Sequence, residues 1–205
     1  NADMDALGSA YALSRSFPDA DIFAPNGLDR VSRMVADKMG VDVLESCDYS
    51  GYDRVVVVDT SSPEQLEGAP EIPSDAIVID HHKPTGRWDF VGTFYCDDTK
   101  TSCCEIVKQI IDAAGVEMRR DVGLMLLGGM LTDSGHFQYA KPAMLPEFSD
   151  IMVRCGIEMD EAMDLTQAPV SMSEKIAMMK AIERTRFDRV GEMIVAISFG
   201  GSFEA

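Results

Sequence analysis

The sequence predicts an α/β fold in which a mostly parallel β-sheet is flanked by helices. The runs V-V-V-V-D at 55–59 and A-I-V-I-D at 76–80 are continuous and rich in β-branched residues, as expected of parallel strands that are covered on both faces. Segments with apolar residues at helical spacing surround them. The 205 residues, 46% of them apolar, suffice for the core of one large domain, or of one domain with a small appendage.

The N-terminal elements alternate helices with a short strand. Apolar residues recur at helical spacing over 6–17, directly after two acidic residues suited to a helix N-terminus. Residues 20–24 are a candidate strand. A second helix is predicted over 28–39, with Gly40 as its stop.

Strands are predicted at 54–59 and 76–80, and the proline- and glycine-rich segment 61–73 between them is typical of a surface crossover. Residues 88–96 are a further candidate strand. The later predicted elements are helices at 102–114, 121–131, 144–155, 158–165 and 171–186, and a last strand at 192–198. The helix at 121–131 is strongly apolar, so we expect it to be buried against the sheet.

The formal net charge of -17 argues against a broad basic surface of the kind that follows long duplex nucleic acid. A phosphate-bearing ligand would therefore need local positive charge, and divalent cations held by carboxylates would supply it. Most of the 35 acidic residues are expected to form a solvated face.

The five cysteines form neither a C-x-x-C pair nor the spacing of a zinc site. We expect them to be reduced and mostly buried, which indicates a reducing cytoplasm. No apolar run in the sequence approaches the roughly 18 residues that a membrane helix needs. The prediction is a cytoplasmic protein that does not contact the membrane.

Several acidic residues stand at the ends of predicted elements. Asp3 and Asp5 lie two residues apart just before the first helix, where short acids also serve as ordinary caps. Asp59 ends the first long strand, where a turn-forming role is the alternative. Open α/β sheets collect their ligands at the carboxyl ends of their strands, so these residues are candidates for a binding site.

Histidines add to this pattern. The motif I-D-H-H-K places Asp80, His81 and His82 at the end of the next strand. The chain has three histidines, so two adjacent ones at a strand end are hard to attribute to core filling. The motif T-D-S-G-H-F contributes Asp133 and His136, with an ordinary helix-end turn as the alternative. Mixed carboxylates and imidazoles are donors for manganese or magnesium, whereas a structural zinc site would favour thiolates.

Four motifs resemble, in order and spacing, motifs one to four of the DHH phosphoesterases. They are N-A-D-M-D-A-L-G-S, V-V-V-D-T, D-H-H and T-D-S-G-H-F, and they span Asn1 to about Phe137. Within that superfamily, the pattern is most similar to the oligoribonuclease and pAp phosphatase branch and its archaeal relatives. The resemblance implies a DHH catalytic domain at 1–165, a linker helix at 166–188, and at 189–205 the start of a smaller, truncated DHHA1-like substrate-binding domain.

The resemblance also implies two Mn²⁺ (or Mg²⁺) ions. Asp3 would bind one ion, Asp5 the other, and Asp59 would bridge them, while His81 and Asp133 would complete their coordination. Two such ions share a water, lower its pKa and clamp the phosphoryl oxygens.

Three residues are implied in catalysis. Beside the bridging Asp59, His82 would hydrogen-bond the phosphoryl group or stabilise the leaving oxygen. Asp80 would orient an imidazole. His136 would face either the substrate or solvent.

The match departs from the family at both ends. At the N-terminus, the family usually carries a first strand and then a histidine four positions before the residue that corresponds to Asp3, whereas the printed sequence begins at Asn1. At the C-terminus, the family's second domain carries a G-G-G-H loop, whereas the printed sequence stops shortly after M-I-V-A-I-S-F-G-G-S. We therefore expect a longer protein, with one metal ligand and most of the substrate-binding domain outside the printed sequence.

The predicted function is a metal-dependent phosphoesterase that hydrolyses phosphodiester or phosphomonoester bonds of short oligonucleotides or pAp. One alternative is the same chemistry on a cyclic dinucleotide, pyrophosphate or polyphosphate. A second is a non-catalytic DHH-like module that binds a partner or nucleotide. A phosphoacceptor receiver domain would explain Asp3, Asp5 and Asp59 but not His81 and His82. The expected partner is the nucleotide phosphoester substrate, and a homodimer is compatible with the sequence.

Overall fold

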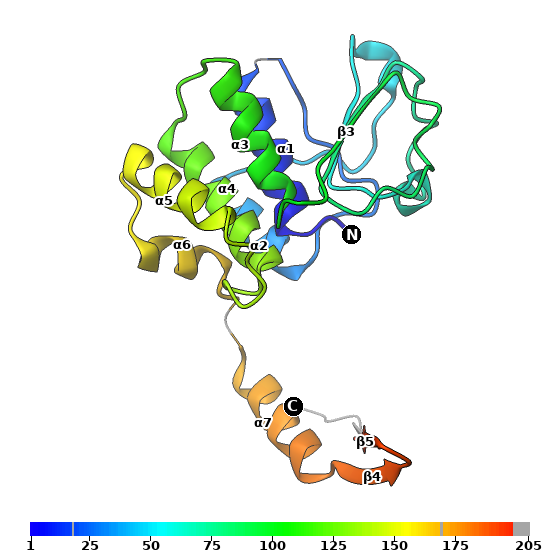
Figure 1. Cartoon of the computed structure of the whole chain (residues 1–205), viewed down its shortest axis with the longest axis vertical. Helices are drawn as coiled ribbons and strands as arrows, with labels where there is room; N and C mark the ends of the chain where they lie inside the picture. Colours follow the sequence, from blue (N-terminus) through cyan, green and yellow to red (C-terminus); the bar gives the residue numbers. More distant parts are fainter. Residues whose placement is uncertain (18, 169, 199–205) are drawn as a thin grey trace. The chain divides into compact units, whose positions relative to one another are not determined.

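The computed structural model describes residues 1–17, 19–168 and 170–198. The chain divides into two compact units, Asn1–Gln167 and Ala168–Ala205, and each is considered by itself (Figure 1).

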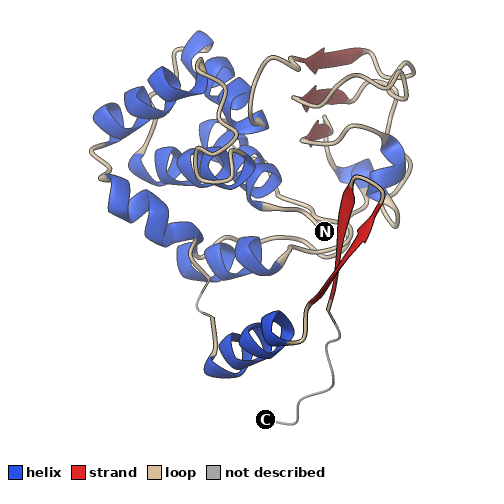
Figure 2. Cartoon of the chain, turned by 60° about the horizontal axis from the view of Figure 1, so that its bottom comes forward, coloured by secondary structure: helices blue, strands red, loops and turns tan. Residues whose placement is uncertain are grey.

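The sheet of the first unit confirms the predicted α/β class. Its described strands are parallel throughout and lie in the order β1-β2-β3 (Figure 2). Their bounds are β1 (Val56–Val58), β2 (Ile77–Asp80) and β3 (Thr93–Cys96). Because parallel strands have their carboxyl ends at one edge, the residues that follow β1 and β2 emerge side by side.

Two strand predictions were wrong in extent. Residues 20–24 form no regular strand, and this segment contributes only an isolated parallel bridge between Phe23 and Leu44. The third strand begins at Thr93 and not at Trp88. The Trp88 ring is instead buried in a small core beneath the sheet, since a large aromatic side chain gains more from burial than from a place at an edge strand.

The helices of the first unit follow the predicted order. They are α1 (Met4–Ser16), α2 (Arg30–Met39), α3 (Cys103–Ala113), α4 (Arg120–Asp133), α5 (Met144–Cys155) and α6 (Met159–Thr166). Side chains of Asp3, Asp29 and Ser102 cap α1, α2 and α3, which satisfies free backbone N–H groups. Gly40 ends α2 in the left-handed conformation, as predicted.

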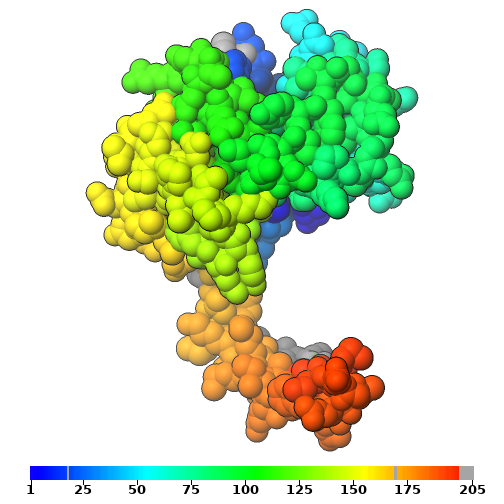
Figure 3. Space-filling model, in the orientation of Figure 1, coloured from blue at the N-terminus to red at the C-terminus, as the bar shows by residue number. Residues whose placement is uncertain are grey.

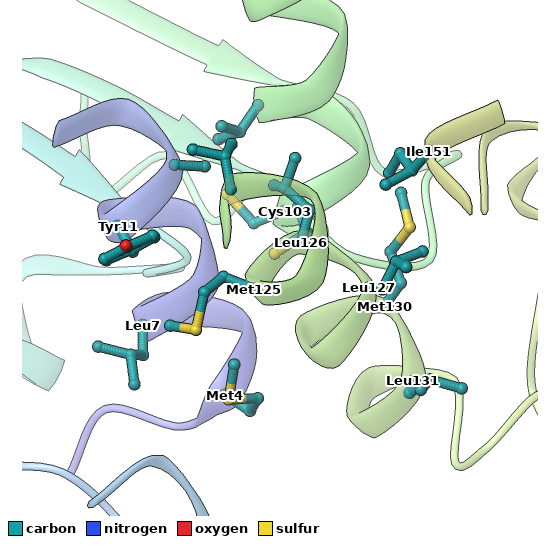
Figure 4. Packing of buried hydrophobic residues seen from close by; sticks show 14 of the residues in the cluster. Met4, Leu7, Tyr11, Cys103, Met125, Leu126, Leu127, Met130, Leu131 and Ile151 are labelled. Atoms are coloured by element: carbon teal, nitrogen blue, oxygen red, sulfur yellow. The ribbon is translucent and has the colours of Figure 1, made fainter. Parts of the chain in front are cut away.

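Helix α4 is buried, but its surroundings differ from the prediction. It packs against α1, α3, α5 and α6, whereas α1 and α3 make the main helix contacts with β1 and β2. Glycines permit the close approach, because a Cβ at Gly8 of α1 would lie 2.6 Å from the backbone oxygen of Met125 of α4. Figure 4 shows Met4 and Leu7 of α1 beside Met125. In Figure 3 the blue atoms of α1 are visible only at the margins of the green and yellow surface.

The two faces of the sheet have different covers. Val58 and Ile79 belong to the large core that the helices form. Val57 and Val78 point to the other face and pack with Trp88 in a smaller core, covered by the crossover segments and not by an α-helix. The alternation follows from the two-residue period of a strand.

The second unit contains a helix and a hairpin. Helix α7 (Met172–Glu183) precedes strands β4 (Arg186–Val190) and β5 (Met193–Ile197), which pair antiparallel. The predicted last strand is present as β5, but the prediction missed β4 and extended the helix to Arg186, because the charged sequence R-F-D-R-V lacks a strand pattern. Residues 199–205 of the expected substrate-binding domain lie outside the described residues.

Among the described residues, no helix combines the length and apolar character needed to cross a bilayer.

Candidate metal centre

Four segments that are distant in sequence bring acidic side chains around His81. The Nε2 atom of His81 lies 3.2 Å from an oxygen of Asp133, 3.3 Å from an oxygen of Asp59 and 3.7 Å from an oxygen of Asp5. Asp59 follows β1, His81 follows β2, Asp5 is in the first turn of α1 and Asp133 ends α4. The sheet edge and two helix ends thus build one polar cluster.

Asp5 is held in place by the start of α3. Its Oδ2 accepts a hydrogen bond of 2.6 Å from the backbone N–H of Cys103, and its Oδ1 accepts one of 2.9 Å from that of Cys104. The side chain is fully buried. Burial, and then the charges of Asp59 and Asp133, raise the pKa of Asp5 well above its ordinary value. The carboxylate is therefore fixed in orientation and lies in a field that favours a cation.

The role of Cys103 and Cys104 was not predicted from the sequence. The available signal was the capping box Ser102–Glu105, which marks the start of a helix directly after β3. The position of Asp5 at that helix start is a contact over 98 residues of sequence, which a local pattern cannot show. Burial raises the pKa of both thiols well above 9.0, and neither cysteine belongs to a ligand group found among the described residues.

Asp3 is the N-cap of α1. Its Oδ1 accepts hydrogen bonds from the backbone N–H groups of Asp5 (3.1 Å) and Ala6 (3.0 Å), so the capping alternative describes one part of its role. Burial and the charge of Asp59 raise the pKa of Asp3 to about 6. Its carboxylate is thus close enough to interact electrostatically with the cluster, although Asp3 belongs to neither ligand group found among the described residues.

Asp59 adopts a left-handed backbone conformation, with φ of 53°, which is sparsely populated for residues other than glycine and is tolerated best by Asp and Asn. Its N–H continues the sheet by donating to the Ile79 oxygen (2.9 Å). Backbone strain of this kind is concentrated at functional sites. The turn at Asp59 directs the chain into the loop that borders the cluster.

Asp59 Oδ1 and His81 Nε2 are buried, and neither has a hydrogen-bond partner within the described residues. Buried polar atoms are nearly always paired, because an unpaired one loses its solvation without compensation. These two atoms lie 3.3 Å apart in the centre of the cluster. A divalent cation contacting both would satisfy them, so the donor set fits a metal ion.

The electrostatics lead to the same interpretation. Burial lowers the pKa of His81, but its contacts with Asp133 and Asp59 outweigh that effect and raise the pKa to about 10. The cluster thus concentrates negative charge around whatever positive group lies at its centre. The position of Asp133 adds to this charge, because the C-terminal end of a helix carries partial negative charge. The sequence predicted Asp133 just beyond α4, whereas it is the last residue of that helix.

Asp80 and His82 form a second layer. Asp80 is buried, and its Oδ1 accepts a hydrogen bond of 2.8 Å from Nδ1 of the more exposed His82. This bond fixes the His82 tautomer with Nε2 free to face a ligand. It also raises the pKa of His82, whereas burial lowers it. The orienting role of Asp80 stays a prediction, and this hydrogen bond is the contact through which it would act.

His136 is not part of the cluster as described. It is exposed, lies in the turn after α4 with φ of 56°, and donates its backbone N–H to Leu131 (2.7 Å). The turn sets the backbone at this point, and the His136 ring belongs to neither ligand group of the described residues.

Two groups of described side chains can hold a metal ion, and they share His81. One is Asp59, His81 and His82, and the other is Asp5, His81 and Asp133; the ligand atoms of each lie within 4.8 Å of one another. Oxygen and imidazole donors without thiolate suit the class of ions that includes Mn²⁺ and Mg²⁺.

The fold and this cluster define an α/β domain with a candidate metal site, and comparison with known proteins identifies its family. The model of the DHH family, N-terminal domain, matches residues 1–130. The chain belongs to the DHH family.

Three curated relatives support this assignment. An uncharacterized protein of Methanocaldococcus jannaschii is 28% identical over all of this chain and 64% of its own length. A bifunctional oligoribonuclease and PAP phosphatase of Thermus thermophilus is 30% identical over 55% of this chain and 34% of its own. A protein of Lactococcus lactis named as a manganese-dependent inorganic pyrophosphatase, with the qualifier "probable", is 27% identical over 64% of this chain and 45% of its own.

A solved structure is similar in fold. The exopolyphosphatase-related protein of Bacteroides fragilis superposes with a TM-score of 0.72 at 19% identity, over 90% of this chain and 59% of that protein. The chain therefore spans less than two thirds of the length of each of these relatives.

Proposed function

We propose that the chain is the catalytic domain of a phosphoesterase that uses two Mn²⁺ or Mg²⁺ ions to hydrolyse short oligonucleotides or pAp. The observation that carries the proposal is the pair of buried, unpartnered ligand atoms, Asp59 Oδ1 and His81 Nε2, within a ring of carboxylates. The Thermus thermophilus relative, which is named for both of these activities, supports the substrate class.

The proposed ligands are Asp3, Asp5, Asp59, His81 and Asp133. When bound, two divalent ions lower the pKa of a water and polarise the phosphoryl oxygens. The bridging role of Asp59 is the one that the family resemblance implies, and its Oδ1, 3.3 Å from Nε2 of His81, would contact an ion together with that imidazole. Asp5, fixed by two backbone N–H groups, would keep its ligand oxygen in place without rearrangement.

The proposed role of His82 is to contact the substrate. Its Nδ1 donates to Asp80, and this contact raises the pKa of His82, so the protonated ring could donate from Nε2 to a phosphoryl or leaving oxygen. Its side chain is 46% exposed, against 10% for His81, which suits contact with a substrate that enters from solvent. Asp80 would hold the imidazole in that orientation.

Hydrolysis of pyrophosphate is a second candidate, because the Lactococcus lactis relative is named for it. A non-catalytic binding module would not require the buried carboxylates around His81. Their presence favours an enzyme.

The test is manganese-dependent release of mononucleotide from a short RNA, with pAp and pyrophosphate assayed in parallel. Asp59→Asn removes one charge, and asparagine tolerates the left-handed backbone, so the variant should fold. Its kcat should be lower by about 10³-fold, which corresponds to the several kcal/mol that a metal ion contributes to catalysis. Asp75→Asn is the control, because Asp75 is an exposed acid paired with Arg54. Equal activity of Asp59→Asn and Asp75→Asn would refute the bridging role.

A further inference from the structure

Two loops that leave the metal centre are fastened to each other. The loop after β1 contains Thr60 and Ser61, and the loop after β2 contains Thr85 and Trp88. The indole N–H of the buried Trp88 donates to the Thr60 oxygen (2.9 Å). The hydroxyl of Thr85 donates to the Ser61 oxygen (2.9 Å). These bonds hold the loops in a defined relative position, as a binding surface requires.

An open surface hollow of about 490 Å³ lies between the loops and is lined by four residues with polar or charged groups, Ser62, Glu64, Thr85 and Arg87. Across it, Nη1 of Arg87 contacts Oε1 of Glu64 at 2.7 Å. Both side chains are largely exposed, 64% for Arg87 and 60% for Glu64. The pair therefore adds little to stability, and its remaining hydrogen-bonding groups are accessible.

The hollow is near the proposed reaction centre. Ser62 is three residues after Asp59, and Thr85 is three residues after His82. Three residues span at most about 11 Å when fully extended. A nucleoside attached to a phosphate at the centre could therefore reach the hollow.

The chemistry of the hollow suits a sugar and a base better than a second phosphate. The Arg87 charge is offset by Glu64, so a bare phosphate would gain little. The guanidinium has five N–H donors, and a carboxylate can accept from ribose hydroxyls, as one does in dinucleotide-binding folds. Hydroxyl, carboxylate and guanidinium groups together can satisfy the mixed donors and acceptors of a nucleoside.

The geometry points to this hollow as the nucleoside subsite of the enzyme, with Glu64 accepting from the ribose hydroxyls and Arg87 donating to the sugar or base. The inference rests on the proposed function and deepens it, because inorganic pyrophosphate has nothing to place in the hollow. Glu64 and Arg87 would thus determine specificity for nucleotide over inorganic substrates, and for ribose over deoxyribose.

The test compares binding of AMP with binding of inorganic phosphate to the manganese-loaded protein by calorimetry. Arg87→Ala should weaken AMP binding about tenfold, the effect of one charged hydrogen bond, and leave phosphate binding unchanged. Arg54→Ala is the matched control, because Arg54 also forms an exposed ion pair, 3.0 Å from Asp75. It precedes β1 and so lies at the opposite end of that strand from Asp59.

A kinetic measurement complements the binding test. For a short RNA, Arg87→Ala and Glu64→Ala should raise KM and leave kcat nearly unchanged, whereas the kinetics of pyrophosphate, if it is hydrolysed, should not respond. Glu64→Ala should also reduce the preference for AMP over deoxy-AMP. Equal AMP affinity in Arg87→Ala and Arg54→Ala would overturn the subsite. Absence of all hydrolysis, with AMP binding lost only in Arg87→Ala, would count against the proposed function and support the subsite.

Discussion

The first unit contains two clusters of carboxylates with opposite electrostatics. Around Lys108, the side chains of Asp150 (2.8 Å), Asp112 (2.9 Å) and Glu147 (2.5 Å) surround a buried ammonium group. Around His81, carboxylate oxygens lie 3.2, 3.3 and 3.7 Å from Nε2, and the described residues provide no lysine or arginine partner. The same residue types thus form a closed ion-pair network in one place and a site for an external cation in the other.

The pKa directions express this difference. Lys108 lowers the pKa of Asp150, and with Arg154 it outweighs burial to lower that of Asp112. At the metal centre, burial and neighbouring acids raise the pKa of Asp3 and Asp5 instead. A cluster built around a lysine keeps its acids ionised, whereas around His81 the positive charge depends on protonation of the imidazole or on a bound ion.

Removing the internal cation should have the largest effect on stability. Lys108→Met leaves three carboxylates facing one another, so we expect the free energy of unfolding to fall by about 2–3 kcal/mol. This is less than for a fully buried pair, since the acids are partly exposed. Urea unfolding measures it, with Lys38→Met, at an exposed position of α2, as the control. If the free energy of unfolding fell no more in Lys108→Met than in Lys38→Met, Lys108 would not stabilise its carboxylate cluster.

Adding the external cation should have the next largest effect. Manganese at 100 times its dissociation constant should raise the free energy of unfolding by about 2.7 kcal/mol. Lys108→Met should gain the same amount, because its substitution is outside the centre, and Asp59→Asn should gain much less. Thermal unfolding with and without manganese provides the measurement. Equal gains in wild type and Asp59→Asn would place the ion elsewhere.

The effect of pH on stability differs in sign between the two clusters. The folded-state pKa of His81 is raised from 6.5 to about 10, so its contribution is complete below pH 6.5 and is lost as the pH rises to about 10. The pKa of Asp150 is lowered from 3.8, so its contribution is present above that pH and is lost in acid.

In chelator, wild type and Lys108→Met should therefore both lose stability between pH 7 and 9.5. Asp59→Asn should lose less, because His81 has one negative neighbour fewer. Urea unfolding at several pH values checks this. A profile that is flat over this range in wild type would contradict the described environment of His81.

The sequence was sufficient for much of the fold. The β-branched runs that became β1 and β2, and the capped amphipathic segments that became α2 and α3, are local patterns, and local patterns carry secondary structure. The placement of Trp88 in a core beneath the sheet, the burial of α4 among helices and the strand β4 were missed. Trp88 and α4 were placed by packing against residues distant in sequence, which overrode a weak local preference. Strand β4 was missed because its charged sequence R-F-D-R-V lacks a strand pattern, although it pairs with the neighbouring β5.

By itself, the sequence determined the ligand types and the strand ends on which Asp59 and His81 lie, since both follow from residue identity and strand pattern. It could not distinguish Asp3 from Asp5, which looked alike as acids before a helix. Only the tertiary structure decided that Asp3 caps α1 while Asp5 is clamped against the start of α3 beside His81. The reason is physical: the orientation of a side chain within a site depends on contacts about a hundred residues away, and these exist only once the chain has folded.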